Sequence, residues 1–222
     1  MFDTNSVWSR TSTTDPIISD RAYNLSIGFV LFWGFALNFI TAMTIPVATI
    51  AAIPFWLLLI GYILCCFAGI SIYQNSDNPM ISFLGYNLIV IPMGIVLTPL
   101  VLSYESNIIA QAMATTGGVT LCMMIMGTIY PAFFLSIGRT LFFSLIALIV
   151  VELILGLFFN MDSTIFDWIG AGIFSGYIGY DWARANQIPK TLDNAVDSAA
   201  SLYVDIINLF IRILRILGRS RR

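Results

Sequence analysis

Seven long apolar runs determine what this chain can fold into. Each is about 20 residues long or more, the length that an α-helix needs to cross the hydrocarbon core of a bilayer. Prolines and polar stretches separate them. The runs cover about 24–45, 50–73, 80–103, 106–129, 138–159, 164–184 and 198–217. The sequence therefore predicts an all-α, polytopic membrane protein.

Composition supports a membrane protein and argues against other classes. The 222 residues are 59% hydrophobic and 10% charged, whereas roughly a quarter of a typical soluble domain is charged. The lipid bilayer is the expected partner, and a net charge of −2 argues against nucleic acid. The three cysteines have neither a disulfide framework nor metal-ligand spacing, so no cofactor is expected. Because histidine is absent, any response to physiological pH must come from carboxyl groups.

The chain divides into a polar N-terminal tail at 1–22, a seven-helix transmembrane domain at 23–218 and a basic C-terminal tail at 219–222. Its orientation is undecided. If all seven runs cross, the 10 basic residues divide equally between the two sides, and the positive-inside rule gives no preference. If the last run does not fully cross, all of them lie on one side. This favours cytoplasmic termini with a partly buried or re-entrant last helix, although a shielded central helix could cross regardless.

The last run carries a polar stripe. Its polar residues recur every three or four positions and so share one helical face. Because a carboxylate is costly in hydrocarbon, Asp205 should face protein or water. Arg212 is about 10 Å away along the helix, so Asp205 needs a partner from another helix. Arg212, Arg215 and the basic tail are interpreted as an anchor at the membrane surface. The stripe comprises Asn194, Ser198, Ser201, Asp205, Asn208, Arg212, Arg215 and Arg219.

Asp181, near the end of the sixth run, is the expected partner of Asp205. A loop of about a dozen residues would make the two helices antiparallel neighbours, with both carboxyl groups at similar depth. Two such groups in a dry site cannot both ionise cheaply, so they would share one proton. The pair would act as a pH-dependent latch, closed when protonated, and repelling or taking a cation when doubly ionised. Oxygen ligands of this type suit Ca²⁺.

Other polar residues have supporting or structural interpretations. Glu152, near the middle of the fifth run, is an ion or proton site or a buried partner for an arginine. Alternatively, it is neutral or packs in an interface. Asn208 and Ser201 are predicted to line the seam that Asp205 faces. Asp193 and Asp197 are interpreted as structural acids in the connecting loop or first turn, where they favour the start of a helix. A local ion pair between Asp181 and Arg184, three residues apart, is a further possibility.

Several segments resemble the Bax inhibitor family, also called transmembrane Bax inhibitor motif proteins. Gly179-Tyr-Asp181, Asp193 and the stretch 201–218 are similar to its carboxy-terminal signature, while 82–88 and 97–100 resemble its third helix and the exit from it. The resemblance implies a seven-helix bundle with the C-terminal helix packed centrally. It also implies a pH-dependent calcium leak, with the acid pair carried by Asp181 and Asp205. Bacterial members lie in the inner membrane, and the lack of long loops favours that location.

The second run departs from the family pattern. Relatives carry an acid there, and basic residues at its end latch onto the acid pair, whereas residues 54–73 contain no charge. An equivalent latch would need Arg139 or Arg184, or would not exist. The acid at Glu152 is not expected from the family either.

Two other functions stay open. The protein could be a non-conducting membrane scaffold or regulator whose acids serve only packing. It could instead be an intramembrane aspartyl protease, because Tyr180-Asp181 fits half of that motif. The other half requires Gly-x-Gly-Asp, but Leu202-Tyr-Val precedes Asp205. The chain is therefore expected not to be an enzyme.

Overall fold

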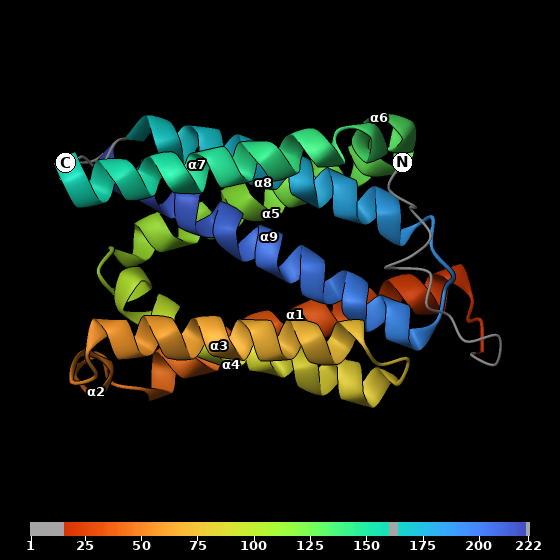
Figure 1. Cartoon of the computed structure of the whole chain (residues 1–222), viewed down its shortest axis with the longest axis horizontal. Coiled ribbons are helices and arrows are strands. Elements are labelled where there is room, and N and C mark those ends of the chain that lie inside the picture. Colours follow the sequence, from red (N-terminus) through yellow and green to blue (C-terminus); the bar gives the residue numbers. More distant parts are fainter. Residues whose placement is uncertain (1–15, 160–163, 221–222) are drawn as a thin grey trace. The chain divides into compact units, whose positions relative to one another are not determined.

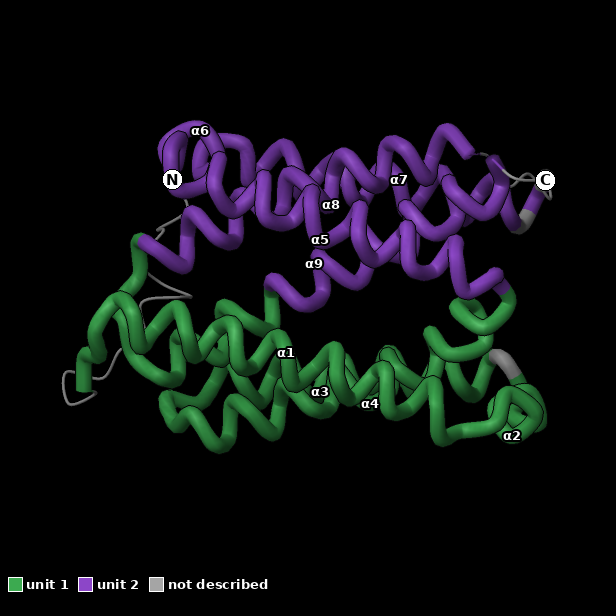
Figure 2. The backbone as a smooth tube through the Cα atoms, turned by 180° about the vertical axis from the view of Figure 1, so that it is seen from behind, with its two compact units in different colours: residues 1–103, 187–201 green, residues 104–186, 202–222 purple. Residues whose placement is uncertain are grey.

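The structure, a computed structural model, describes residues 16–159 and 164–220, which form helices and no strand (Figure 1). These residues fall into two compact units (Figure 2). Unit 1 contains the described residues up to Ser103 together with Gln187–Ser201, and unit 2 contains Tyr104–Asn186 and the residues from Leu202 onwards. The all-α prediction is confirmed. The seven-helix bundle with a central last helix and the three-part division of the chain stay predictions, and residues 1–15, 221 and 222 of the two predicted tails lie outside the described residues.

Unit 1 is built from α1 to α4 and the first part of α9. Ser19 caps α1, since its hydroxyl accepts a hydrogen bond from the Ala22 amide at 3.2 Å, and Asn78 caps α4 in the same way through Met80 at 2.9 Å. Pro54 precedes the first residue of α3, which is where proline is tolerated. The helices are α1 (Asp20–Thr44), α2 (Val47–Ala51), α3 (Phe55–Gln74) and α4 (Pro79–Leu102).

Two glycines let α3 and α4 approach closely within unit 1. A Cβ atom on Gly69 would lie 2.5 Å from the carbonyl oxygen of Gly85, and a Cβ atom on Gly85 would lie 2.7 Å from that of Gly69. Without such small residues the backbones could not meet, which is a common basis of helix association in membranes. On the other side of α4, the Tyr86 hydroxyl donates to the Val30 carbonyl of α1 at 3.0 Å.

Unit 2 is built from α5 to α8 and the rest of α9. Pro131 starts the short helix α6 and so separates it from α5. Figure 1 shows α7 and α8 running beside each other, and small residues of α8 face its neighbours. A Cβ atom on Gly176 would lie 2.8 Å from Leu141 of α7, and one on Gly127 of α5 would lie 2.7 Å from the Gly179 carbonyl. The helices are α5 (Ser106–Ile129), α6 (Pro131–Ser136), α7 (Gly138–Phe159), α8 (Thr164–Ala185) and α9 (Leu192–Arg219).

The seven predicted runs each correspond to a long helix in the described part of the chain, with two corrections to their boundaries. The second run starts at 55 rather than 50, because Pro54 ends the preceding segment, where the short α2 forms. The last run starts at 192 rather than 198, so the connection from α8 is residues 186–191, not a loop of a dozen. Asp193 and Asp197 therefore lie within α9. Thr191 supports this earlier start, since its hydroxyl accepts from the Asn194 amide at 3.1 Å.

Five of the described helices are long and apolar enough to cross a membrane, which supports a multi-pass protein in contact with lipid. They are α1, most of α3, α4, α5 and the first part of α7. Helices α8 and α9, which contain the predicted site, carry more charged residues than these five helices. Their crossing, and with it the orientation of the chain, stays a prediction.

The α3–α4 contact leads to a stability prediction. We expect Gly69→Ala to lower the free energy of unfolding by about 1–3 kcal/mol, because overpacking would force the two backbones apart. Gly61→Ala in the same helix is the matched control, since a Cβ atom there meets nothing within 4 Å. Thermal unfolding in detergent measures both variants. Equal midpoints for the two would contradict the close approach.

Candidate functional site

The carboxyl groups of Asp181 and Asp205 meet within unit 2. Asp181 lies in the last turns of α8 and Asp205 lies in α9, and their side chains share a hydrogen bond. Asp205 is only 7% exposed, and its Oδ2 atom has no hydrogen-bond partner among the described residues. The predicted proximity of the two acids is therefore present. Since an ionised carboxylate can only accept, a hydrogen bond between two carboxyl groups requires that one of them carries a proton.

Tyrosine and arginine side chains of α8 surround this pair. Tyr177 is one turn before Asp181 and interacts electrostatically with both acids. Arg184 lies three residues after Asp181 and acts on it as a nearby positive charge, so the predicted local pairing has a structural basis. The arrangement places one cation and one phenol next to the carboxyl pair.

The remaining supporting residues of the prediction are more dispersed. Asn208 donates through Nδ2 to the Val204 carbonyl of its own helix at 2.7 Å, and it is half-buried like Ser201. Arg139 is exposed in the first turn of α7. The roles predicted for these three residues, and the binding of Ca²⁺ by the acid pair, stay predictions. Among the described residues no group of three or more histidine, cysteine, aspartate or glutamate side chains is placed to hold a metal ion.

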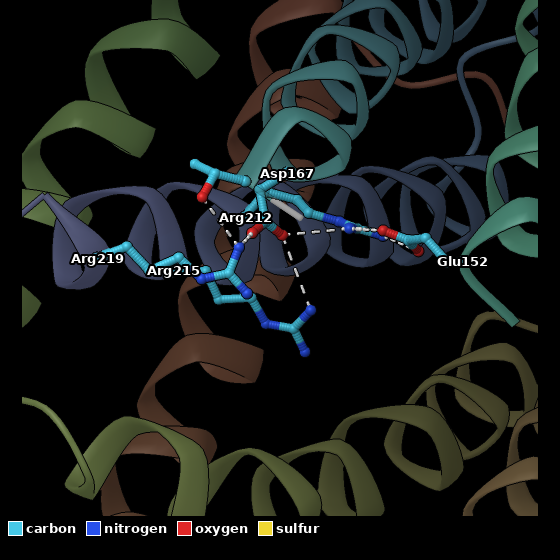
Figure 3. A network of polar contacts seen from close by, with 6 residues as sticks. Glu152, Asp167, Arg212, Arg215 and Arg219 are labelled. Carbon is cyan, nitrogen blue, oxygen red and sulfur yellow. Dashed lines mark hydrogen bonds and ion pairs between the residues drawn. The ribbon is translucent and has the colours of Figure 1, made fainter. Parts of the chain in front are cut away.

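Arg212 is a buried ion-pair residue, and its interpretation as part of a surface anchor is wrong. Its guanidinium contacts both carboxylate oxygens of Glu152 in α7, with Nη2 to Oε2 at 2.8 Å (Figure 3). Its Nη1 atom also lies 3.3 Å from Oδ1 of Asp167 in α8. The Arg212 side chain is 12% exposed. Of the interpretations of Glu152, the structure shows the partner for an arginine, although the Glu152 side chain is only partly buried.

Asp167 is the centre of this network. Its side chain is 2% exposed, and Arg219 contacts its Oδ2 atom at 2.9 Å while Arg215 lies 3.8 Å from Oδ1. Arg219 also donates to the Thr164 hydroxyl at 3.3 Å. Sequence reasoning did not single out Asp167 and missed this role. The available signal was its place three residues into the apolar sixth run, where an acid needs a cation.

A second polar cluster occurs in unit 1, at the start of α9. The Ser82 hydroxyl of α4 donates to Oδ1 of Asp193 at 2.6 Å and also hydrogen bonds with Asp197. Nearby, the Tyr23 and Ser198 hydroxyls lie 3.0 Å apart. Burial raises the pKa of Asp197 to about 8, and the Asp193 carboxylate adds to the rise while the Ser82 hydrogen bond opposes it. These contacts join α9 to α1 and α4, as expected for structural acids.

The fold and these charged contacts define an all-α, multi-pass membrane protein with ionisable groups paired on its last three helices. The chain matches the family described as inhibitor of apoptosis-promoting Bax1 over residues 19–222, and it belongs to that family. The resemblance drawn from the C-terminal signature is thereby confirmed.

Bacterial membrane proteins are among its relatives. An uncharacterised membrane protein of Streptococcus pyogenes serotype M1 is 30% identical over 170 residues, which cover 73% of this chain and 72% of the relative. One from Vibrio cholerae serotype O1 is 27% identical over 227 residues, covering 98% and 96%. An uncharacterised protein of Helicobacter pylori is 40% identical over 87 residues, covering 37% and 36%.

The raised pKa of Asp197, which lies outside the five apolar spans, gives a prediction about stability. A carboxyl group whose pKa is higher in the folded chain contributes stability below its unfolded pKa of about 4 and loses it as the pH rises through about 8. Asn mimics the protonated form. We therefore expect Asp197→Asn to raise the unfolding midpoint at pH 9 relative to the wild type by at least about 2–4 °C, the shift that each kcal/mol of stability produces in a chain of this size.

Thermal unfolding at pH 5 and pH 9 in one detergent tests this expectation. The difference between variant and wild type should be small at pH 5 and grow with pH. Asp20→Asn is the control, because Asp20 is mostly exposed and should show a constant difference. A difference for Asp197→Asn that does not change with pH would refute the assignment.

Proposed function

We propose that this protein is a pH-sensitive calcium-leak channel, gated by protonation of the Asp181 and Asp205 pair. The observation that carries the proposal is the hydrogen bond between the two carboxyl groups, one of them almost fully buried. Membership of the family supports it as well, since the resemblance of Gly179-Tyr-Asp181 and 201–218 led to the same residues.

The shared proton explains how the pair could act as a gate. When one carboxyl group is protonated, it donates to the other and ties α8 to α9. When the proton leaves to solvent, two negative charges face each other across the former hydrogen bond. At about 4 Å and an effective dielectric constant of about 20, their repulsion is about 4 kcal/mol. The helices must then separate at this point, or a cation must enter between the acids.

Calcium fits this site as a passing ion. Carboxylate oxygens are hard ligands that suit Ca²⁺, which takes six to eight oxygens. Asp181 and Asp205 offer at most four, so water must supply the rest. Incomplete coordination favours transient binding, which a leak pathway needs because an ion must leave as readily as it enters.

The remaining expectations form part of the same proposal. The protein acts as a channel rather than as an enzyme, and it contains no resident cofactor. Ca²⁺ and protons are its small partners, and the inner membrane of a bacterium is its location. The bacterial origin of the relatives supports this location.

Calcium flux in liposomes tests the gate. Vesicles with an enclosed calcium dye and equal pH on both sides should show a leak that increases at least tenfold between pH 5 and pH 8, each factor of ten being about 1.4 kcal/mol of barrier. We expect Asp205→Asn to hold the leak at its low-pH value throughout, because Asn keeps a hydrogen bond to Asp181 without a titrating proton.

Glu105→Gln is the control for this experiment, because Glu105 is exposed and lies outside the pair. It should follow the wild-type pH profile. An Asp205→Asn variant with unchanged flux and pH profile would reject the gate.

The alternatives predict different results for the same variants. If the protein is a non-conducting scaffold or regulator, replacing both Asp181 and Asp205 by Asn changes thermal stability in detergent and leaves flux unchanged. If the hydrogen-bonded acids are a protease dyad, either variant abolishes cleavage of a membrane substrate.

A further inference from the structure

The Arg212 network lies at the opposite end of α8 from the acid pair. Asp181 of α8 contacts Asp205 of α9. Asp167, fourteen residues before Asp181, contacts Arg219, which is fourteen residues after Asp205. This register means that the two helices run antiparallel within unit 2. Fourteen residues of α-helix are about 21 Å long. The two charged clusters therefore lie near the two ends of one seam between α8 and α9.

Arg212 extends across this seam. Its guanidinium is held by Glu152 of α7 through two contacts and by Asp167 of α8 through one (Figure 3). Three helices of unit 2 are thus linked by a single side chain. Since arginine does not lose its proton in proteins, its positive charge stays fixed over the whole pH range in which the acid pair titrates.

The backbone of α8 is adapted to this side chain. A Cβ atom on Gly170 would lie 2.8 Å from Nε and 3.1 Å from Cδ of Arg212. Because Gly170 has no side chain, the Arg212 side chain can lie directly against α8 at this position. By contrast, a Cβ atom on Gly172, on another face of the same helix, would meet nothing within 4 Å.

We propose that Arg212, held by Glu152 and Asp167, is a second gate of the cation pathway along α8 and α9. A cation that has passed the acid pair next meets the fixed positive charge of Arg212, about 10 Å further along α9. This barrier does not depend on pH, and it limits how fast cations leave once the acid pair has opened. The inference rests on the proposed calcium leak, to which it adds a residue that sets rate and ion selectivity.

The test removes the ion pair without changing the net charge. We expect the double variant Glu152→Gln, Arg212→Gln to raise the calcium leak at pH 8 about tenfold in the liposome assay. The leak at pH 5 and the midpoint of the pH profile should stay at their wild-type values, because the acid pair is intact.

A selectivity measurement separates a gate from loosened packing. The double variant removes the positive charge that Arg212 places between α8 and α9, while the negative charge that it removes belongs to α7. It should therefore increase cation flux only, and the ratio of calcium leak to chloride leak should rise by a similar factor. General loosening would raise both fluxes together and overturn the inference.

A milder variant covers the case in which the double variant does not fold. Gly170→Ala keeps every charge but pushes the Arg212 guanidinium from its position, and we expect a two- to threefold higher leak at pH 8. Gly172→Ala is its matched control, with wild-type leak expected.

The outcomes distinguish this inference from the proposed function. If Asp205→Asn removes the pH response while both the double variant and Gly170→Ala leak as the wild type does at pH 8, the acid gate stands and the arginine gate is wrong. If the wild type conducts no calcium at any pH, the proposed function fails and the second gate fails with it.

Discussion

The cost of placing charge in an apolar environment governs the last three helices of this chain. A charged side chain in hydrocarbon needs a partner or water, and α9 carries one polar residue on nearly every turn of one face. The partners come from neighbouring helices: Ser82 for Asp193, Asp181 for Asp205, Glu152 and Asp167 for Arg212. Each pairing fixes the rotation of α9 about its axis, because a turn of about 100° would move the acid or the arginine into apolar surroundings. The polar stripe thus specifies the packing of the helix more closely than its apolar face, which tolerates many neighbours.

Much of the helical pattern could be predicted from the sequence, because apolar length and proline act locally. Pro131 ends α5, and the boundaries of α5 and α7 agree with the predicted 106–129 and 138–159. Pro54 was given too little weight, although a proline favours the first turn of a helix over its interior. The start of α9 was placed too late because Asp193 and Asp197 were interpreted as acids of the connecting loop or first turn. In the structure both acids contact Ser82 of α4, so tertiary contacts overrode the local signal.

The candidate site was predictable only in part. Asp181 and Asp205 could be paired because a short connection makes successive helices antiparallel, which fixes depth from sequence position alone. The Arg212 network could not be found this way. Contact between Glu152 and Arg212 depends on how α7 is rotated and on which helix lies beside it, and 59 residues separate the two in the chain. Asp167 was missed for a related reason, since a position near a helix end does not tell whether a side chain faces water or the interior.

The family resemblance predicts charged residues on the second long helix, and this chain places its buried charge elsewhere. Helix α3 carries no charge, so it cannot supply the acid and the basic residues that relatives have there. Glu152, the acid that the pattern did not anticipate, is instead the residue that binds an arginine of α9. The ion pair joins α7 to α9, and unit 2 holds the acid pair, the arginine and both of its carboxylate partners. Asp205 and Arg212 lie about 10 Å apart along one continuous helix, so the acid pair and the ion pair share the same part of α9.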